Sequence, residues 1–523
     1  MMKKFKKIFA AIAASALVAA MSFTSMAATT VTVKRNEQSG TVNTTYTYYQ
    51  VLKASVSKDK KNVAYFVENK ELKDAIVGLK IKVNKADGTS EDKELFKVSP
   101  TPAGTRWNVV PTEYLTSLIK NNETDAAKDI AAAFQTIKRW VPEKNKGVFK
   151  NQGETPTAEL DDGYYLVESS LGTALVLETA GAKNGTLEIT EKNEYPSDTK
   201  VVKAPSVMTD DSATYYVTVV VPTTVDPEKK IIVHDKLDAG LSFDKKVKVH
   251  VANRTEAADP STLNDDAFTV LDTTKIEVKT GNADDSCSFH IVIDPSTYVG
   301  QKLVFKYTAK LSDSAVTKQK YNNIEYITYN DTEGKAVYTS QQKTVPVVTY
   351  GFDLKKVFKD SQDTENDLKA TFKLYTDAEY AKGEGAARSP LTFKNSNGYT
   401  VSKTGTVTED ITATKDNVIN VRGLSAGTYH LVETSTADGY NLLDHDIIIE
   451  VTDNKFENGD LNPEGLMHIT NGGKPEQTHS VNIENAKGIK LPSTGGMGTT
   501  VFAIVGLLVM AGAAVTLIVK KRA

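Results

Sequence analysis

Residues 215–221 have the sequence Tyr215-Tyr216-Val217-Thr218-Val219-Val220-Val221, in which large apolar side chains occupy every second position before Pro222. Successive side chains of a β-strand point to opposite faces, so this period of two predicts a strand with one face in a core. The alternation continues at Ile231, Val233 and Asp235, and again along residues 303–311. Alternating strands separated by turns are typical of a β-sandwich, which we predict for residues 196–346.

Residues 347–488 repeat this pattern in a smaller unit. Three strands within it each carry a polar residue on an otherwise apolar face. These faces are Phe352, Leu354 and Lys356; Tyr429, Leu431 and Glu433; and Val481, Ile483 and Asn485. We predict a second sandwich here.

Residues 28–195 combine strand patterns with helical patterns near residues 71–79 and 112–140. The stretch from Gly163 to Glu168 is echoed, with one residue more, by the stretch from Gly427 to Glu433. Two domains of related type are the simplest interpretation. The predicted fold is mainly β: tandem immunoglobulin-like β-sandwich domains, the first with inserted helices, and a C-terminal transmembrane helix.

The two ends of the chain indicate export and anchoring. Four lysines in residues 3–7 precede an apolar stretch over 8–21 and small residues at Ser25 and Ala27, which is typical of a signal peptide over residues 1–27. Residues 489–523 contain the sequence Leu491-Pro492-Ser493-Thr494-Gly495, an uncharged stretch over 501–519, and three basic residues. An apolar helix of about 20 residues spans a bilayer, and the basic residues should stay cytoplasmic.

Composition excludes several classes of function. The net charge of −3 indicates no surface for nucleic acid. The one cysteine, Cys287, cannot form an intrachain disulfide, and its alternation with Phe289 indicates a buried strand residue. The seven histidines show no His-x-x-x-His spacing, so we predict no metal site and no cofactor.

The polar residues on the apolar faces of residues 347–488 suggest chemistry. Strand parity points Lys356, Glu433 and Asn485 into the core, where burial favours a neutral amine and a neutral carboxylic acid. A neutral amine beside a carboxamide that an acid polarises is arranged for transamidation, with release of ammonia. The alternative is an ordinary edge-strand lysine with a solvated glutamate.

These residues also carry a resemblance to a family. The segments 352–357, 370–375 and 427–433, with Asn485, resemble the collagen-adhesin B-type domain. The resemblance implies an isopeptide bond between Lys356 and Asn485, assisted by Glu433, that joins the first and last strands.

The whole chain resembles the sortase-assembled backbone pilins of Gram-positive bacteria, through Lys192-Asn193 and the sorting motif 491–495. The resemblance implies that a sortase cleaves between Thr494 and Gly495 and joins Thr494 to Lys192 of the next subunit. Lys200 and Lys203 are the alternative acceptors. The implied partners are a class C pilin sortase, a housekeeping sortase, other copies of the chain, minor pilins, peptidoglycan and host or bacterial surface receptors.

In the second domain the resemblance implies a bond between Lys200 and Asn323 with Asp235 as the acid, and Asn322 and Lys203 remain alternatives. Glu325 stands where the family usually has a small residue. In the first domain, strand parity points Arg35 inward in place of a lysine, and a permanently charged guanidinium is no nucleophile. We therefore expect no bond there, although Glu168 and Asn193 are present.

The function that follows is a non-enzymatic one: the structural backbone of a covalently polymerised, wall-anchored pilus that supports adhesion. A monomeric wall-anchored adhesin or minor pilin is the first alternative. A wall-anchored surface enzyme is the second, and the sequence shows no catalytic set of residues for it. The five regions that we predict are 1–27, 28–195, 196–346, 347–488 and 489–523.

Overall fold

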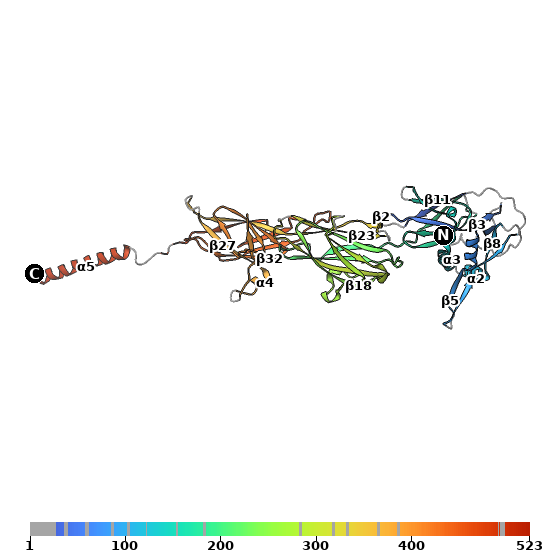
Figure 1. Cartoon of the computed structure of the whole chain (residues 1–523). Coiled ribbons are helices and arrows are strands. Elements are labelled where there is room, and N and C mark those ends of the chain that lie inside the picture. The colour runs from blue at the N-terminus through green and yellow to red at the C-terminus, as the bar shows by residue number, and fades with distance from the viewer. Residues whose placement is uncertain are drawn as a thin grey trace. The chain divides into compact units, whose positions relative to one another are not determined.

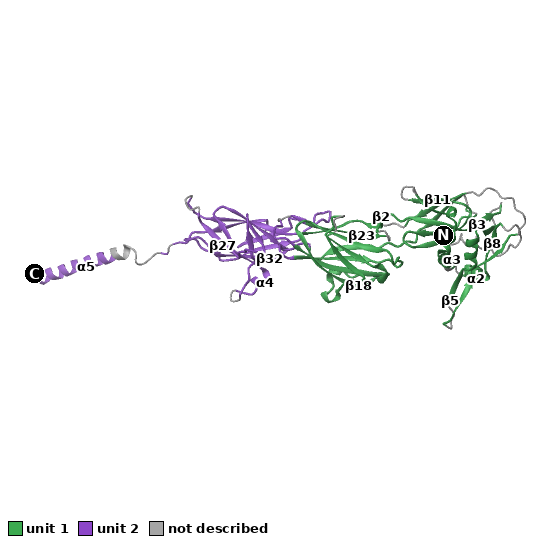
Figure 2. Cartoon of the chain, viewed as in Figure 1, with its two compact units in different colours: residues 1–204, 212–310, 321–347 green, residues 205–211, 311–320, 348–523 purple. Residues whose placement is uncertain are grey.

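The computed structural model describes residues 28–35, 40–57, 62–84, 88–101, 105–121, 123–152, 155–180, 182, 185–281, 285–315, 319–330, 334–362, 367–383, 387–489, 491 and 497–522. The chain is mainly β, as the alternating patterns predict (Figure 1). It divides into two compact units, one of residues 1–204, 212–310 and 321–347, and the other of residues 205–211, 311–320 and 348–523 (Figure 2). The domain boundaries near residues 195 and 346 stay predictions.

The second unit contains a sandwich of two sheets. The sheet with strand order β28-β29-β31-β26-β36 consists of Phe393–Asn395, Tyr399–Val401, Val418–Leu424, Tyr350–Phe358 and Ser480–Asn485. The sheet with order β30-β27-β32-β33-β34-β35 consists of Ile411–Thr414, Lys369–Thr376, Gly427–Ser435, Ile447–Thr452, Leu466–Asn471 and Glu476–Gln477. A short helix, α4 (Asp377–Tyr380), follows β27. The inward apolar residues of both sheets, such as Leu354, Phe372 and Ile483, form one core.

The strands of residues 197–348 also form two sheets. One has the order β15-β16-β22-β18-β19, with bounds Ser197–Val202, Ser212–Val220, Gln301–Leu311, Leu241–Asn253 and Thr269–Val270. The other has the order β2-β24-β23-β17-β21-β20, with bounds Gly40–Val42, Ala336–Ser340, Lys320–Asn330, Lys230–Leu237, Phe289–Ile293 and Ile276–Thr280, and β25 (Lys343–Val348) pairs with β23. The predicted inward residues Val217, Val233 and Phe305 are fully buried.

The edge strand β2 comes from far upstream in the chain. Gly40 pairs with Ser340 and Val42 with Tyr338. A side chain at position 40 would overlap the backbone oxygen of Thr339, so the close approach of the two strands requires glycine. The sequence patterns did not predict this pairing.

The N-terminal part of the first unit consists of strands covered by helices. One sheet has the order β10-β11-β1-β14, with bounds Lys150–Gln152, Thr155–Leu160, Thr29–Lys34 and Thr186–Thr190. The other has the order β13-β12-β3-β4-β8-β7, with bounds Ala174–Glu178, Gly163–Ser169, Tyr46–Val56, Val63–Val67, Trp107–Pro111 and Phe96–Pro100; β9 (Lys146–Val148) pairs with β3, and β5 (Lys80–Asn84) pairs with β6 (Ser90–Glu94). Strand β12 is buried on both faces: Leu166 contacts the core beneath the helices, and Val167 contacts the core beneath β1.

The helical patterns correspond to α1 (Lys70–Val77), α2 (Glu113–Asn121) and α3 (Glu123–Ile137), with a 3-10 turn at Lys138–Trp140. Residue 122, between α2 and α3, lies outside the described residues, and the α-helical part of this pattern ends at Ile137. Cys287 is buried as predicted, but it precedes the strand β21, which begins at Phe289. The C-terminal helix α5 (Met497–Arg522) contains a stretch, Phe502–Lys521, that is long and apolar enough to cross a membrane.

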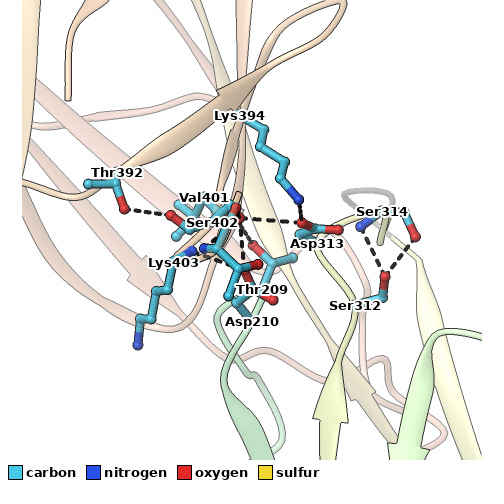
Figure 3. Close-up of polar contacts among 11 residues, drawn as sticks. Thr209, Asp210, Ser312, Asp313, Ser314, Thr392, Lys394, Val401, Ser402 and Lys403 are labelled. Carbon is cyan, nitrogen blue, oxygen red and sulfur yellow. Dashed lines mark hydrogen bonds and ion pairs between the residues drawn. The ribbon is translucent and has the colours of Figure 1, made fainter. Parts of the chain in front are cut away.

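Two short segments from the middle of the chain belong to the second unit, where polar contacts hold them to the strands that follow (Figure 3). The carboxylate of Asp210 accepts hydrogen bonds from Ser402 Oγ at 2.8 Å and from the backbone N–H of Lys403 at 2.9 Å. Asp313 forms an ion pair with Lys394 and accepts a hydrogen bond from Ser402. Residues 205–211 and 311–320 are thereby part of the same compact body as the C-terminal sandwich.

Candidate isopeptide and linkage sites

Lys356 and Asn485 lie on neighbouring strands of the C-terminal sandwich. Strands β26 and β36 run parallel, with Lys356 opposite Ile483 and Phe358 opposite Asn485. Lys356 is completely buried and Asn485 is 1% exposed. The ammonium group of Lys356 donates a hydrogen bond of 2.6 Å to Asn485 Oδ1. The residues that period-two parity selected therefore meet inside the core.

Glu433 reaches the same point from β32 in the opposite sheet. Asn485 Nδ2 donates to both carboxylate oxygens of Glu433, at 3.0 and 2.9 Å, and Lys356 Nζ lies 3.9 Å from Glu433 Oε1. The backbone N–H of Leu443 donates to Glu433 Oε2 at 2.9 Å. The carboxylate is therefore held against the carboxamide by contacts from two directions.

The surroundings of Lys356 favour a nucleophilic amine. Burial lowers the pKa of Lys356 to about 8, against the opposing effects of Glu433 and Glu484. The nitrogen lies over the ring of Phe358, 4.5 Å from its centroid. At that pKa about one-tenth of the amines are neutral at pH 7, compared with a far smaller fraction for a solvated lysine.

In the second predicted domain, Lys200 on β15 faces Asp235 on β17 across the sandwich. Both side chains are fully buried, and Lys200 Nζ lies 2.6 Å from Asp235 Oδ2. Burial lowers the pKa of Lys200 and raises the pKa of Asp235, while the attraction within the pair opposes both shifts. Each shift favours the uncharged form that transamidation requires.

Tyr307 connects this pair to Asn323. The Tyr307 hydroxyl donates to Asp235 Oδ2 and accepts a hydrogen bond of 2.9 Å from Asn323 Nδ2. The sequence placed Tyr307 on the inward face of its strand but did not indicate its place in the site. The alternation of residues 303–311 could have indicated this role, because a tyrosine that faces the core needs a hydrogen-bond partner for its hydroxyl.

The two candidate asparagines are neighbours on strand β23, so their side chains point to opposite faces of the sheet. Asn323 is completely buried on the face of Asp235, whereas Asn322 points to the other face and its backbone N–H donates to Asp238. Asn323 is therefore the one of the two that faces the core.

Glu325 is a second buried acid near Lys200. It is paired across the sheet with Asp235 and is completely buried. Burial and then the nearby charge of Asp198 raise the pKa of Glu325 well above its usual value, against the effects of Lys200 and Lys343. A protonated Glu325 beside Lys200 is compatible with the core because it brings no second negative charge.

In the first predicted domain, Glu168 and Asn193 have different partners. Glu168 forms an ion pair with Lys138 at 2.7 Å, on the side of the helices. Asn193 Nδ2 instead donates to Glu191 at 2.9 Å. The inward Arg35 donates to the backbone oxygen of Thr44 at 3.0 Å. The absence of a bond in this domain stays a prediction.

Lys192 is exposed between two buried neighbours, Glu191 and Asn193. Glu191 accepts hydrogen bonds from Asn193 and from Tyr195, the latter at 3.1 Å. Glu194 accepts from the backbone N–H and the hydroxyl of Thr223. The segment is thus held from both sides while the Lys192 side chain faces solvent.

The alternative acceptors differ in exposure. Lys200 is buried, and Lys203 is exposed just after β15. In the sorting motif, Leu491 is exposed, whereas Pro492, Ser493, Thr494 and Gly495 lie outside the described residues, as does the predicted signal peptide.

Comparison with known proteins adds matches at two places in the chain. Residues 353–462 match the SpaA family, described as a prealbumin-like fold domain, and residues 483–523 match the LPXTG cell wall anchor motif. No curated protein matches the chain.

Among solved structures, the full-length major pilin SpaD of Corynebacterium diphtheriae is 16% identical, with a TM-score of 0.43 over 88% of this chain and 98% of that one. The T6 backbone pilin of Streptococcus pyogenes is 14% identical, with a TM-score of 0.42 over 90% of this chain and 100% of that one. By its LPXTG motif the chain is a surface protein anchored to the cell wall, and residues 353–462 form a SpaA-type domain with a prealbumin-like fold.

Proposed function

We propose that the chain is the backbone subunit of a covalently polymerised pilus, stabilised by Lys–Asn isopeptide bonds within its domains. The observation that carries the proposal is the buried set of Lys356, Asn485 and Glu433 in an exported, wall-anchored chain without a disulfide. Buried lysines and carboxylates are rare in protein cores. Here they lie on both sides of one carboxamide, which is the arrangement that transamidation requires. The role is structural, without a substrate other than the chain itself.

The proposed bond forms by transamidation. Lys356 first transfers a proton to Glu433, 3.9 Å away, so that both groups become neutral. The carboxamide of Asn485 turns so that its oxygen accepts a hydrogen bond from the Glu433 acid. The amine attacks Cγ, the bond from Cγ to Nδ2 breaks, and the proton from the amine passes through Glu433 to the leaving ammonia.

The second proposed bond joins Lys200 to Asn323 with Asp235 as the acid. Lys200 belongs to one sheet and Asn323 to the other, so this bond would cross the sandwich. Tyr307 would hold Asp235 and Asn323 in register through its hydroxyl.

Asn323→Ala is expected to remove the second bond, because it deletes the carboxamide that faces Asp235. Each bond releases one ammonia. After correction for the substitution, the intact mass of the variant should therefore be higher than that of the wild type by one ammonia. Asn322→Ala is the matched control, since Asn322 lies on the other face of the same strand and should leave the mass change intact. Loss of the bond in the Asn322 variant would overturn this assignment.

Polymerisation is proposed to join Thr494 of one subunit to Lys192 of the next. Lys192 is exposed on a segment whose neighbours are hydrogen-bonded, which supports its role as the acceptor. The match to the LPXTG motif supports Thr494 as the donor. An immunoblot of wall extracts tests it: a ladder of high-mass species is expected. A single band would instead indicate a monomeric wall-anchored adhesin or minor pilin.

Mature fibres are expected to contain no residue after Thr494, because the sortase would separate Thr494 from Gly495. The helix α5 would then be absent from the fibre and serve only to hold the precursor in the membrane. Peptide mapping of purified fibres checks this, and recovery of peptides from residues 497–522 would contradict it.

A further inference from the structure

The outer face of strand β17 carries a group of side chains that the pilin function does not use. Asp235 points into the core, so its neighbour His234 points to the opposite face of the same sheet. His234 is paired across the sheet with His290 on β21. The rings are in contact edge to face, with centroids 4.7 Å apart.

The turn that precedes β21 adds a carboxylate and a thiol to these imidazoles. Asp285 Oδ2 lies 3.0 Å from His234 Nδ1 and 2.6 Å from His290 Nε2. Cys287 Sγ lies 3.9 Å from His234 Nδ1. One ligand atom from each of the four residues lies within 4.8 Å of all the others.

We propose that this cluster binds a zinc ion. Imidazole nitrogen, thiolate sulfur and carboxylate oxygen are the ligands of protein zinc sites, and four ligands suit its tetrahedral structural sites. The proposed ligands are His234, Asp285, Cys287 and His290. This site is independent of the proposed polymerisation.

The four ligand atoms, all within 4.8 Å of one another, lie near the spacing that a zinc ion requires. Zinc bonds of about 2.0–2.3 Å in a tetrahedron place ligand atoms about 3.3–3.8 Å apart. The separation of Cys287 and His234 is 3.9 Å, and the carboxylate of Asp285 would have to move from the imidazoles by less than about 1 Å. The exposed fraction of the Asp285 side chain, 23%, leaves room for that movement.

Neighbouring residues hold the ligands in place. Thr328 Oγ1 lies 3.0 Å from His234 Nε2, and a hydrogen bond from Nε2–H to this oxygen leaves the Nδ1 lone pair directed at the cluster. The ring of Tyr326 stacks on His234 with an interplanar angle of 2°. The turn is fixed to β17 by the hydrogen bond from Leu237 N to Ser288 Oγ, of 2.9 Å.

Charge also favours a divalent cation. With Cys287 as thiolate and Asp285 as carboxylate, two negative charges balance the ion, and the thiol proton is released to solvent on binding. His290 is 4% exposed and Cys287 is 7% exposed, so the ion would be largely shielded from water. The site would fasten the turn at 285–287 to two strands, which is the role that disulfides have in many exported proteins.

The sequence predicted no metal site because its histidines lack zinc-type spacing. The structure shows why spacing is a poor guide here: His234 is 51 residues from Asp285 and 53 from Cys287. Pairing of β17 with β21 brings these distant residues together.

Titration of the metal-free mature chain with cobalt(II) and zinc(II) tests the proposal. We expect saturation at one ion per chain, with the absorption of a thiolate-to-cobalt charge transfer that zinc abolishes by displacement. Zinc should also protect Cys287 from alkylation under mild denaturation. The absence of one-to-one binding, or cobalt binding without the thiolate absorption, would overturn the proposal.

Variants distinguish the ligands from their surroundings. Cys287→Ser should weaken zinc binding by more than about a hundredfold, and Thr328→Val by about ten- to a hundredfold, because support of a ligating imidazole is typically worth that much. His430→Asn is the matched control: His430 is buried beside Asp446 and Asp377 without a thiol, and its replacement should leave zinc affinity unchanged. Circular dichroism confirms that each variant is folded, and unchanged zinc affinity in folded Cys287→Ser protein would refute the site.

Discussion

Lys192→Ala is expected to abolish the ladder of high-mass species in wall extracts while monomer is still exported and anchored to the wall. The amine of Lys192 is the proposed acceptor for the Thr494 acyl group, and it is exposed on a segment that Glu191, Asn193 and Glu194 hold in place. Removing the amine leaves the sorting motif intact, so wall anchoring should continue. An immunoblot of wall and culture fractions measures both outcomes.

Lys203→Ala is the matched control for this experiment. Lys203 is also exposed and lies close in sequence, so its loss should leave the ladder unchanged. A ladder that persists in the Lys192 variant and disappears in the Lys203 variant would move the linkage to Lys203. A ladder that persists in both would reject the proposed junction.

Glu433→Ala is expected to prevent the bond between Lys356 and Asn485 and to leave the Lys200–Asn323 bond in place. Without the acid, the carboxamide is not polarised and the lysine loses its proton acceptor 3.9 Å away. Intact mass, corrected for the substitution, should be higher than that of the wild type by one ammonia. The bond closes a loop of 129 residues, and by the entropy argument for crosslinks its loss lowers the free energy of unfolding by up to about 5 kcal/mol.

The proposed bond between Lys356 and Asn485 matters most when the chain is pulled from its two ends. Strands β26 and β36 lie near the two ends of the C-terminal sandwich in sequence and side by side in its sheet. With a covalent bond between them, a pulling force passes from one strand to the other without separating the sheets. Resistance to heat and to protease should therefore fall in the Glu433→Ala variant.

Two further variants make this test specific. Glu433→Gln keeps the size of the side chain and removes the acid, so it should behave as Glu433→Ala does without leaving a cavity. Glu484→Ala removes an exposed glutamate next to Asn485 and should leave both bonds intact. If the Glu433 variants still lose the same ammonia, the glutamate is not the acid of this site.

Strand parity pointed Lys356, Glu433, Asn485, Asp235 and Asn323 inward, with Asn322 left as an alternative, and the family resemblance added Lys200. All six residues are buried, and the bonds between them stay proposals. Parity is a local property, since each side chain faces the same way as residues two positions before and after it. The anchor motif and the apolar C-terminal helix could likewise be predicted from the sequence, because each is encoded by a continuous stretch.

What only the tertiary structure decided is which inward residues meet. The place of Tyr307 between Asp235 and Asn323, the nearness of Glu325 to Lys200, and the pairing of Gly40–Val42 with β24 all depend on strand order and register. The gathering of His234, Asp285, Cys287 and His290 has the same origin. Alternation along a strand specifies a face but carries no information about the neighbouring strand, and that neighbour is chosen by the packing of the whole sheet.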